Sequence, residues 1–93
     1  MIVSFADRDA ERLFQRQRVK RLDPRLHRKA LITLWLLDAV HELDELRVPP
    51  GNRLEALKGA RIGQHSIRIN DQWRICFVWT PEGPSEVEIV DYH

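Results

Sequence analysis

The sequence predicts a small α+β domain in which two N-terminal helices pack on a mostly antiparallel β-meander. Between residues 8 and 42 apolar side chains recur at helical spacing, and from residue 65 onward they alternate with polar ones at the period of a half-buried strand. Length is the third observation, because 93 residues suffice for one modest core. Residues 1–93 are therefore expected to form a single domain.

The N-terminal part is predicted to contain a short strand at residues 2–5 and a first helix. Asp7 or Ser4 would cap this helix, which would run to about Gln17. Three apolar residues form its expected buried stripe: Ala10, Leu13 and Phe14.

A second helix is predicted from Asp23-Pro24, an N-cap followed by proline at the first helical position, to about Glu42. Six residues at helical spacing would pack on the sheet: Leu26, Ala30, Thr33, Leu34, Leu37 and Val40. Leu31, Trp35 and Leu36 widen the apolar arc beyond what one sheet face needs. Either the small domain buries them, or they form a surface for a partner.

The helical part should end at residues 49–51, Pro-Pro-Gly, and residues 52–58 should begin the sheet. Later strands are separated by turn formers at residues 70–72 and 81–84. With a three-residue loop at 70–72, Ile67 lies opposite Ile75, and Ile69 opposite Trp73. The apolar residues of the last strand, Val87 and Ile89, should match Phe77 and Trp79.

The same register places Arg68 opposite Arg74 on the other face of the sheet. Like charges that face each other across a ladder are unfavourable, which is tolerated more readily where an anion such as phosphate binds between them. Residue parity adds Tyr92 to this face, near Arg74. The alternative is a solvated face whose arginines pair with Glu86 or Glu88.

Positive charge is concentrated near the N-terminus, although the formal net charge is only +1. From residue 8 to residue 29 there are nine lysines and arginines against three carboxylates. Such a segment suits nucleic acid or an acidic protein partner. Its alternative is a solvated helix face.

Several functional classes find no support in the composition. The single cysteine, Cys76, excludes an internal disulfide and reads as a packing residue within a strand. The four histidines have no recurring ligand spacing, so neither a metal nor a cofactor is expected. The longest apolar run, residues 30–37, is too short to cross a bilayer, and no apolar leader precedes it. A cytoplasmic protein without membrane contact is expected.

Four segments together resemble the HigB-type plasmid-maintenance killer proteins of the RelE superfamily, the toxins of type II toxin–antitoxin modules. They are PPGNRLEALKG at 49–59, GQHSIRIN at 63–70, WRI at 73–75 and the terminal DYH at 91–93. With the opening IVSF at 2–5, the likeness covers nearly the whole chain. It lies in the ordered set at matching spacings, since no single motif would suffice.

The resemblance implies a RelE-like fold and an mRNA endonuclease that acts in the ribosomal A site without metal. In such proteins the ribose 2′-hydroxyl attacks the adjacent phosphate and a 5′-hydroxyl leaves, which requires a base, an acid and cations. The implied partners are a HigA-like helix-turn-helix antitoxin, the ribosome and its mRNA. Operator DNA would be contacted only through the antitoxin.

Carried over residue by residue, Lys58 and Arg74 match the basic site positions of the family, and Asp91, Tyr92 and His93 match its C-terminal catalytic cluster. Tyr92 would stack on a base or orient the phosphate, and His93 would transfer a proton near neutral pH. Three arginines would contact the RNA backbone: Arg53, Arg61 and Arg68.

Glu55 departs from the family, because some members have histidine there. The general base is therefore Glu55, His93 or Asp91. Strand parity alone places Asp91 and His93 away from the arginines, whereas the resemblance places them at the site. Arg74 is expected to be exposed on its strand, so that its removal would abolish activity and leave the fold intact.

Two other functions remain open. The same fold family includes ParE-like proteins, which poison DNA gyrase by binding and have no nuclease site. The other is a non-catalytic module that binds RNA or an antitoxin. The terminal Asp-Tyr-His and the basic pair Lys58 and Arg74 favour the nuclease.

Overall fold

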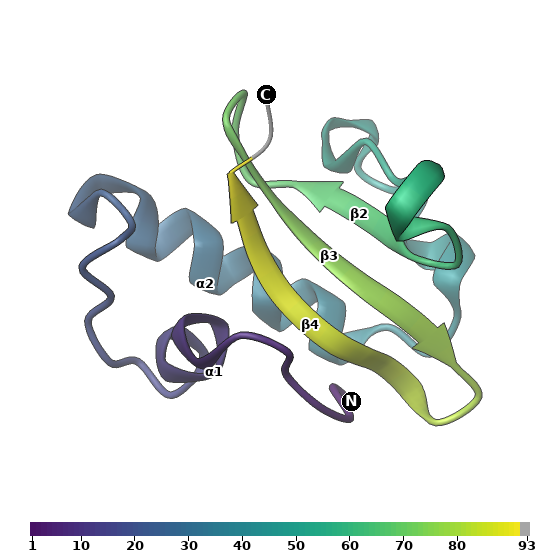
Figure 1. Ribbon diagram of the computed structural model, residues 1–93, viewed down its shortest axis with the longest axis horizontal. Coiled ribbons are helices and arrows are strands. Elements are labelled where there is room, and N and C mark those ends of the chain that lie inside the picture. Colours follow the sequence, from purple (N-terminus) through teal and green to yellow (C-terminus); the bar gives the residue numbers. More distant parts are fainter. Residues whose placement is uncertain (92–93) are drawn as a thin grey trace.

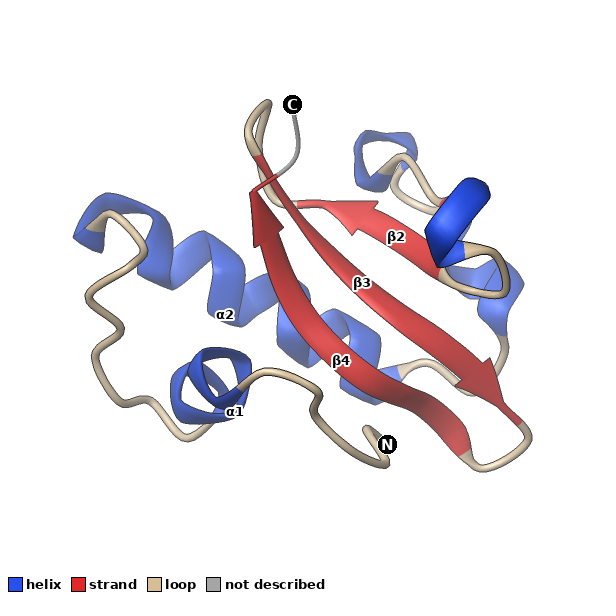
Figure 2. Ribbon diagram, in the orientation of Figure 1, coloured by secondary structure: helices blue, strands red, loops and turns tan. Residues whose placement is uncertain are grey.

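A computed structural model describes residues 1–91 as a four-stranded antiparallel sheet with two α-helices on one side (Figures 1 and 2). The main elements are α1 (Arg8–Phe14), α2 (Pro24–Ala39), β1 (Glu55–Ala56), β2 (His65–Arg68), β3 (Trp73–Thr80) and β4 (Gly83–Asp91). Three 3₁₀ helices lie between α2 and β2: η1 (Leu43–Arg47), η2 (Pro50–Asn52) and η3 (Gly59–Arg61). The strands follow one another in the order β1-β2-β3-β4. The predicted α+β class is confirmed.

The first helix begins as predicted and ends early. The Asp7 carboxylate caps α1 by accepting the backbone N–H of Asp9 at 2.8 Å. The helix ends at Phe14, before the predicted Gln17. Arg16 has a left-handed backbone with φ of 64°, which a continuing right-handed helix excludes.

The second helix also begins as predicted. The Asp23 carboxylate accepts the backbone N–H of Arg25 at 2.9 Å. The helix ends at Ala39 and does not reach Glu42. There the Glu45 carboxylate accepts the N–H of Glu42 at 2.6 Å and caps η1, so the chain starts a new helical turn instead of extending α2.

The strand predicted at residues 2–5 is reduced to a single parallel bridge between Phe5 and Val87. Backbone hydrogen bonds flank this bridge, including one from Ala6 N–H to the Val87 carbonyl at 2.9 Å. The backbone pairing stops after Val87. The next N–H on this edge of β4, that of Ile89, donates to the Asp7 carboxylate at 3.1 Å instead of to a backbone carbonyl.

Across the 70–72 loop the predicted register is confirmed. Ile67 lies opposite Ile75, and Arg68 lies opposite Arg74. This loop is held by the Asn70 side chain, whose Oδ1 accepts the backbone N–H groups of residues 72 and 73.

For β3 and β4, the prediction of which residues face the core is confirmed, but the predicted register is wrong. Ile89 lies opposite Ile75, not opposite Phe77. A β-bulge interrupts this ladder, and Glu86 has a left-handed φ of 51° beside it. The error amounts to two residues, and because side chains alternate along a strand, Val87 and Ile89 still face the core.

The hydrophobic core fills the space between the helices and one sheet face. Its sheet residues are Ile67, Ile69, Trp73, Ile75, Phe77, Val87 and Ile89, and its helical residues include Ala10, Leu13, Ala30, Leu34 and Leu37. The apolar arc of α2 is divided: Leu36 packs against the core, as one alternative expected, whereas Trp35 stays 41% exposed, and a partner surface there stays a prediction. No helix within residues 1–91 is both long and apolar enough to span a membrane.

Candidate functional site

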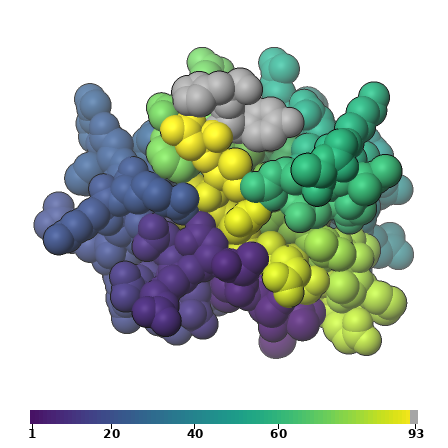
Figure 3. Space-filling view, viewed as in Figure 1, coloured from purple at the N-terminus to yellow at the C-terminus, as the bar shows by residue number. Residues whose placement is uncertain are grey.

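The sheet face turned away from the core, here called the arginine face, carries two rows of facing residues. The ladders place Glu55, Ser66, Cys76 and Glu88 in one row, and Arg68, Arg74 and Val90 in the next. In Figure 1, α2 passes behind the sheet, and the turn around residue 60 lies in front of it. In Figure 3, the end of β4 (yellow) lies between the N-terminal segment (purple) and this turn (teal).

Arg74 is the centre of this face, and it is buried. Only 7% of the residue is exposed, so the expectation of an exposed strand arginine is wrong. Its Nε donates to Ser66 Oγ at 2.8 Å, and its Nη2 donates to the Arg53 carbonyl at 2.6 Å. The segment before β1 lies over the strand and covers the guanidinium. Arg74 thereby links β2, β3 and the chain that enters β1.

Within residues 1–91, Glu55 forms an ion pair with this guanidinium. Its Oε1 lies 3.9 Å from Arg74 Nη1, and the Glu55 side chain is 51% exposed. Arg53 and Lys58 flank it along the chain, and both are exposed. Arg53 has a left-handed φ of 46°, which turns its carbonyl toward Arg74. The structure therefore brings Glu55, Arg53 and Arg74 together.

Arg68 lies beside Arg74 and is partly open to solvent. Its guanidinium pairs with Asp71, whose side chain is 98% exposed. Such surface ion pairs contribute little to stability, so exchanging Asp71 for a phosphate costs little. Glu88, one of the carboxylates that the sequence offered to Arg68 or Arg74, pairs instead with Arg61, at 2.5 Å.

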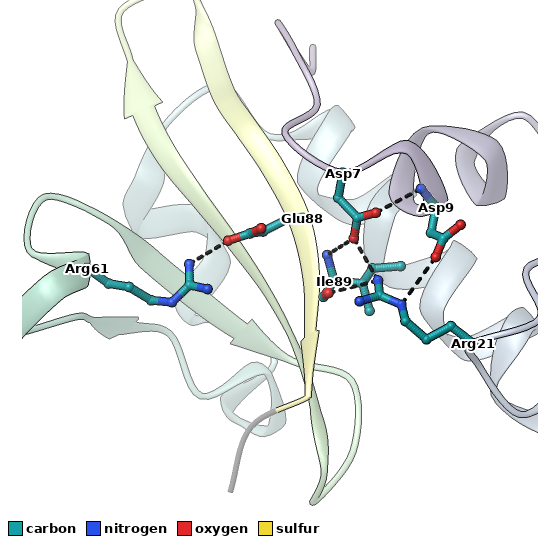
Figure 4. Close-up of polar contacts among 6 residues, drawn as sticks. All are labelled: Asp7, Asp9, Arg21, Arg61, Glu88 and Ile89. Carbon is teal, nitrogen blue, oxygen red and sulfur yellow. Dashed lines mark hydrogen bonds and ion pairs between the residues drawn. The ribbon is translucent and has the colours of Figure 1, made fainter.

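Arg61 reaches the face from η3. Its Nη1 donates to Gln64 Oε1 at 3.0 Å. It also donates to Glu88 on β4, the contact that Figure 4 shows. It approaches the row that contains Cys76, whose thiol is buried. Burial raises the pKa of the Cys76 thiol, which keeps it protonated at neutral pH. The prediction that Cys76 is a packing residue is confirmed by this burial.

The C-terminal residues are described only as far as Asp91. Asp91 lies opposite Trp73, at the end of the sheet, and its Oδ2 accepts from Gln72 Nε2 at 3.2 Å. Its pairing with Trp73 gives it the parity expected from the sequence, that of the core-facing residues. The expectations for Tyr92 and His93 fall outside the described residues.

The end of β4 is positioned by a contact that sequence reasoning missed (Figure 4). Arg21 Nη2 donates to Asp7 Oδ2 at 2.7 Å and to the Ile89 carbonyl at 3.0 Å. Because Asp7 also accepts the Ile89 N–H, the two side chains together satisfy the edge of β4 two residues before Asp91. The sequence identified Asp7 as a cap, but no local signal ties Arg21 to a strand 68 residues later.

Ser66 is the other missed residue. It is fully buried, and its hydroxyl accepts from Arg74. Residue alternation around Ile67 is the signal that would have found it, because it places Ser66 on the same face as Arg68. Within residues 1–91, no cluster of His, Cys, Asp and Glu side chains is suited to hold a metal ion. Catalysis without metal stays a prediction.

Comparison with known proteins identifies the family. Residues 3–93 match the HigB-like toxin family, described as the RelE-like toxin of the type II toxin–antitoxin system HigB. The chain belongs to this family. It is also 40% identical over 80 residues to Toxin HigB-1 of Vibrio cholerae serotype O1, an alignment that covers 85% of this chain and 84% of that toxin.

Solved structures show the same fold for this HigB-like chain. YafQ from E. coli strain BL21(DE3) superposes with a TM-score of 0.60 and 16% identity, covering 98% of this chain and 91% of YafQ. A YoeB/ParE toxin from Agrobacterium tumefaciens gives a TM-score of 0.50 and 22% identity, covering 99% of this chain and 96% of that one. At these identities the likeness concerns the fold. The family match confirms the resemblance to HigB-type, RelE-like toxins drawn from the sequence.

Proposed function

We propose that this HigB-like toxin is a ribosome-dependent mRNA endonuclease whose chemistry takes place on the arginine face. One observation carries the proposal: Arg68 and Arg74 face each other on β2 and β3, with the Glu55 carboxylate 3.9 Å from the Arg74 guanidinium. Two cations and a carboxylate are the groups that attack of a 2′-hydroxyl on its neighbouring phosphate requires.

The residues divide into two roles. Arg68, Arg53 and Lys58 are the more accessible cations, and they are proposed to bind the phosphates on either side of the cleaved bond. Arg74 is held by Ser66 and by the Arg53 carbonyl, so its positive charge is fixed in place before substrate arrives. Such preorganised charge stabilises a developing phosphorane without further reorganisation.

Proton transfer is assigned to Glu55 and the C-terminal cluster. Glu55 is proposed to take the 2′ proton, because it is half exposed and lies 3.9 Å from the Arg74 guanidinium. Asp91, Tyr92 and His93 are proposed to supply the acid for the 5′ oxygen, as the family resemblance implies. Arg61 is proposed as a further RNA contact, for which a phosphate would replace Glu88. The site of action is the cytoplasm, where ribosomes translate.

The test is mRNA cleavage in a purified translation system with and without ribosomes. Cleavage only in the presence of ribosomes is expected, mapped by primer extension. DNA cleavage that depends on gyrase, with intact mRNA, would instead assign the ParE-like function. If the protein binds the ribosome or the antitoxin but neither mRNA nor DNA is cleaved, it is a non-catalytic binding module.

A matched pair of variants separates the site from general charge loss. Arg68 pairs with Asp71, and Arg47 on η1 pairs with Asp44, each as an exposed ion pair three residues apart. Arg68→Ala is expected to slow cleavage by about 100-fold or more, whereas Arg47→Ala should be indistinguishable from wild type. Equal effects of the two substitutions would remove the arginine face from the mechanism.

A further inference from the structure

A groove between α1 and α2 lies outside the candidate site. It has a volume of about 480 Å³, and its walls include Leu13 on α1, Arg16 on the chain that connects α1 to α2, and Arg28, Ile32 and Trp35 on α2. Figure 1 shows the connecting chain swinging outward from α1 before it returns to the start of α2. Residues of this connecting chain line the groove together with α2 and the last turn of α1.

The floor of the groove is apolar and exposed. Ile32 is 48% exposed and Trp35 is 41% exposed, on the side of α2 that does not contact the sheet. Adjacent exposed apolar side chains of this size mark a contact surface more often than an ordinary solvated helix. The arc that widens α2 beyond the needs of the core is therefore directed at this groove.

The rim of the groove is positively charged. Arg16, Arg18 and Arg28 line it, and no aspartate or glutamate does so among residues 1–91. Other arginines of the basic segment, residues 8–29, are neutralised within the fold: Arg21 pairs with Asp7 and Asp9, and Arg25 pairs with Asp23. Three of the other seven lysines and arginines of this segment line the groove, so positive charge borders the apolar floor.

This combination favours a protein segment over RNA. A phosphate backbone needs the cations alone and gains nothing from an aliphatic floor. A base would compete with the Arg16 guanidinium for a face of the Trp35 ring, because this guanidinium lies over the ring, 5.2 Å from its centroid. An acidic protein segment with apolar side chains on one face would contact the apolar floor with that face and pair its carboxylates with the arginines of the rim.

We propose that the groove between α1 and α2 binds an acidic, amphipathic segment of the antitoxin. The proposal rests on membership of a toxin–antitoxin family and not on the ribonuclease chemistry of the proposed function. Because the groove lies on the helices and the arginine face lies on the opposite side of the sheet, the same toxin molecule can present both surfaces. Ile32 and Trp35 would contact the apolar side of the segment, and the three arginines would contact its carboxylates.

Two exposed isoleucines provide a matched test. Ile32 lies in the groove, and Ile62, which is 80% exposed, lies beside η3. Affinity for the purified antitoxin encoded beside the toxin gene would be measured by titration calorimetry without RNA. Ile32→Glu should weaken binding by about tenfold or more, because a new carboxylate meets an acidic segment over an apolar floor. Ile62→Glu should stay within about twofold.

A second variant tests the charges. Arg18→Glu should also weaken binding, and the wild-type affinity should fall as salt rises from 50 to 500 mM, as screening requires (the Debye length shrinks to a few ångströms). Urea midpoints for each variant confirm that it folds. Unchanged antitoxin affinity for Ile32→Glu, or a larger loss for Ile62→Glu, would overturn the proposal. Loss of ribosome binding with intact antitoxin binding would also overturn it and make the groove an RNA surface. Cleavage is assayed separately, so a toxin that cuts no RNA leaves this result intact.

Discussion

Arg74 should be as important for the stability of the fold as for catalysis. Arg74→Ala removes two short hydrogen bonds from a guanidinium that is 7% exposed, one to Ser66 Oγ at 2.8 Å and one to the Arg53 carbonyl at 2.6 Å. Hydrogen bonds to charged groups contribute about 1.5–3 kcal/mol each, and both acceptors would be left without this donor. We expect the free energy of unfolding to fall by about 3–6 kcal/mol.

Urea denaturation followed by tryptophan fluorescence measures this loss. With an m-value of about 2 kcal/mol per M, the midpoint should drop by about 2 M urea. Arg74→Lys keeps the charge but cannot donate through a planar fork, so about half of the loss is expected. Arg47→Ala, which breaks only an exposed pair with Asp44, should leave the free energy of unfolding within about 0.5 kcal/mol of wild type.

Activity has to be compared at a urea concentration and temperature where each variant is fully folded. Under those conditions Arg74→Lys should still cleave more slowly than wild type, because the fixed orientation of the charge is lost. An Arg74→Ala protein with an unchanged midpoint would refute the reasoning. It would mean that the segment over β3 is held by other contacts and that Arg74 acts on the substrate alone.

Three further outcomes follow from the same geometry. Glu55→Gln should slow cleavage by about 100-fold or more with little change in stability, since Glu55 is 51% exposed; unchanged cleavage would move the general base to the C-terminal cluster. Asp7→Ala should lower the free energy of unfolding by about 2–4 kcal/mol, because Asp7 both caps α1 and accepts the Ile89 N–H; Asp7→Asn, which keeps the cap oxygen, should lose less in the same urea titration. The Cys76 thiol, whose pKa burial raises, should react with a thiol reagent only after unfolding. Because the thiol ionises at lower pH in the unfolded chain than in the folded one, the free energy of unfolding should keep its full value below the unfolded thiol pKa and decrease as pH rises above it. Rapid labelling of the folded protein at pH 8 would contradict the burial of this thiol.

Local rules were enough for the elements whose determinants are close in sequence. Asp23-Pro24 starts α2 because both the cap and the proline act within one turn. Arg68 lies opposite Arg74 because a three-residue loop leaves one register that buries both flanking isoleucines. Family membership was also accessible, since the ordered motifs are a property of the sequence itself and the family match covers residues 3–93.

Tertiary structure decided which of these residues are exposed and what they touch. Periodicity assigns Arg74 to the face away from the core, but it carries no information on the segment before β1 that covers that face. The bulge that shifts β4 and the Arg21 contact with Ile89 depend in the same way on groups distant in the chain. A sequence pattern reports which side of a strand a residue occupies. Whether that side meets water, a loop or a partner depends on long-range packing, whose energy comes from contacts that no local window contains.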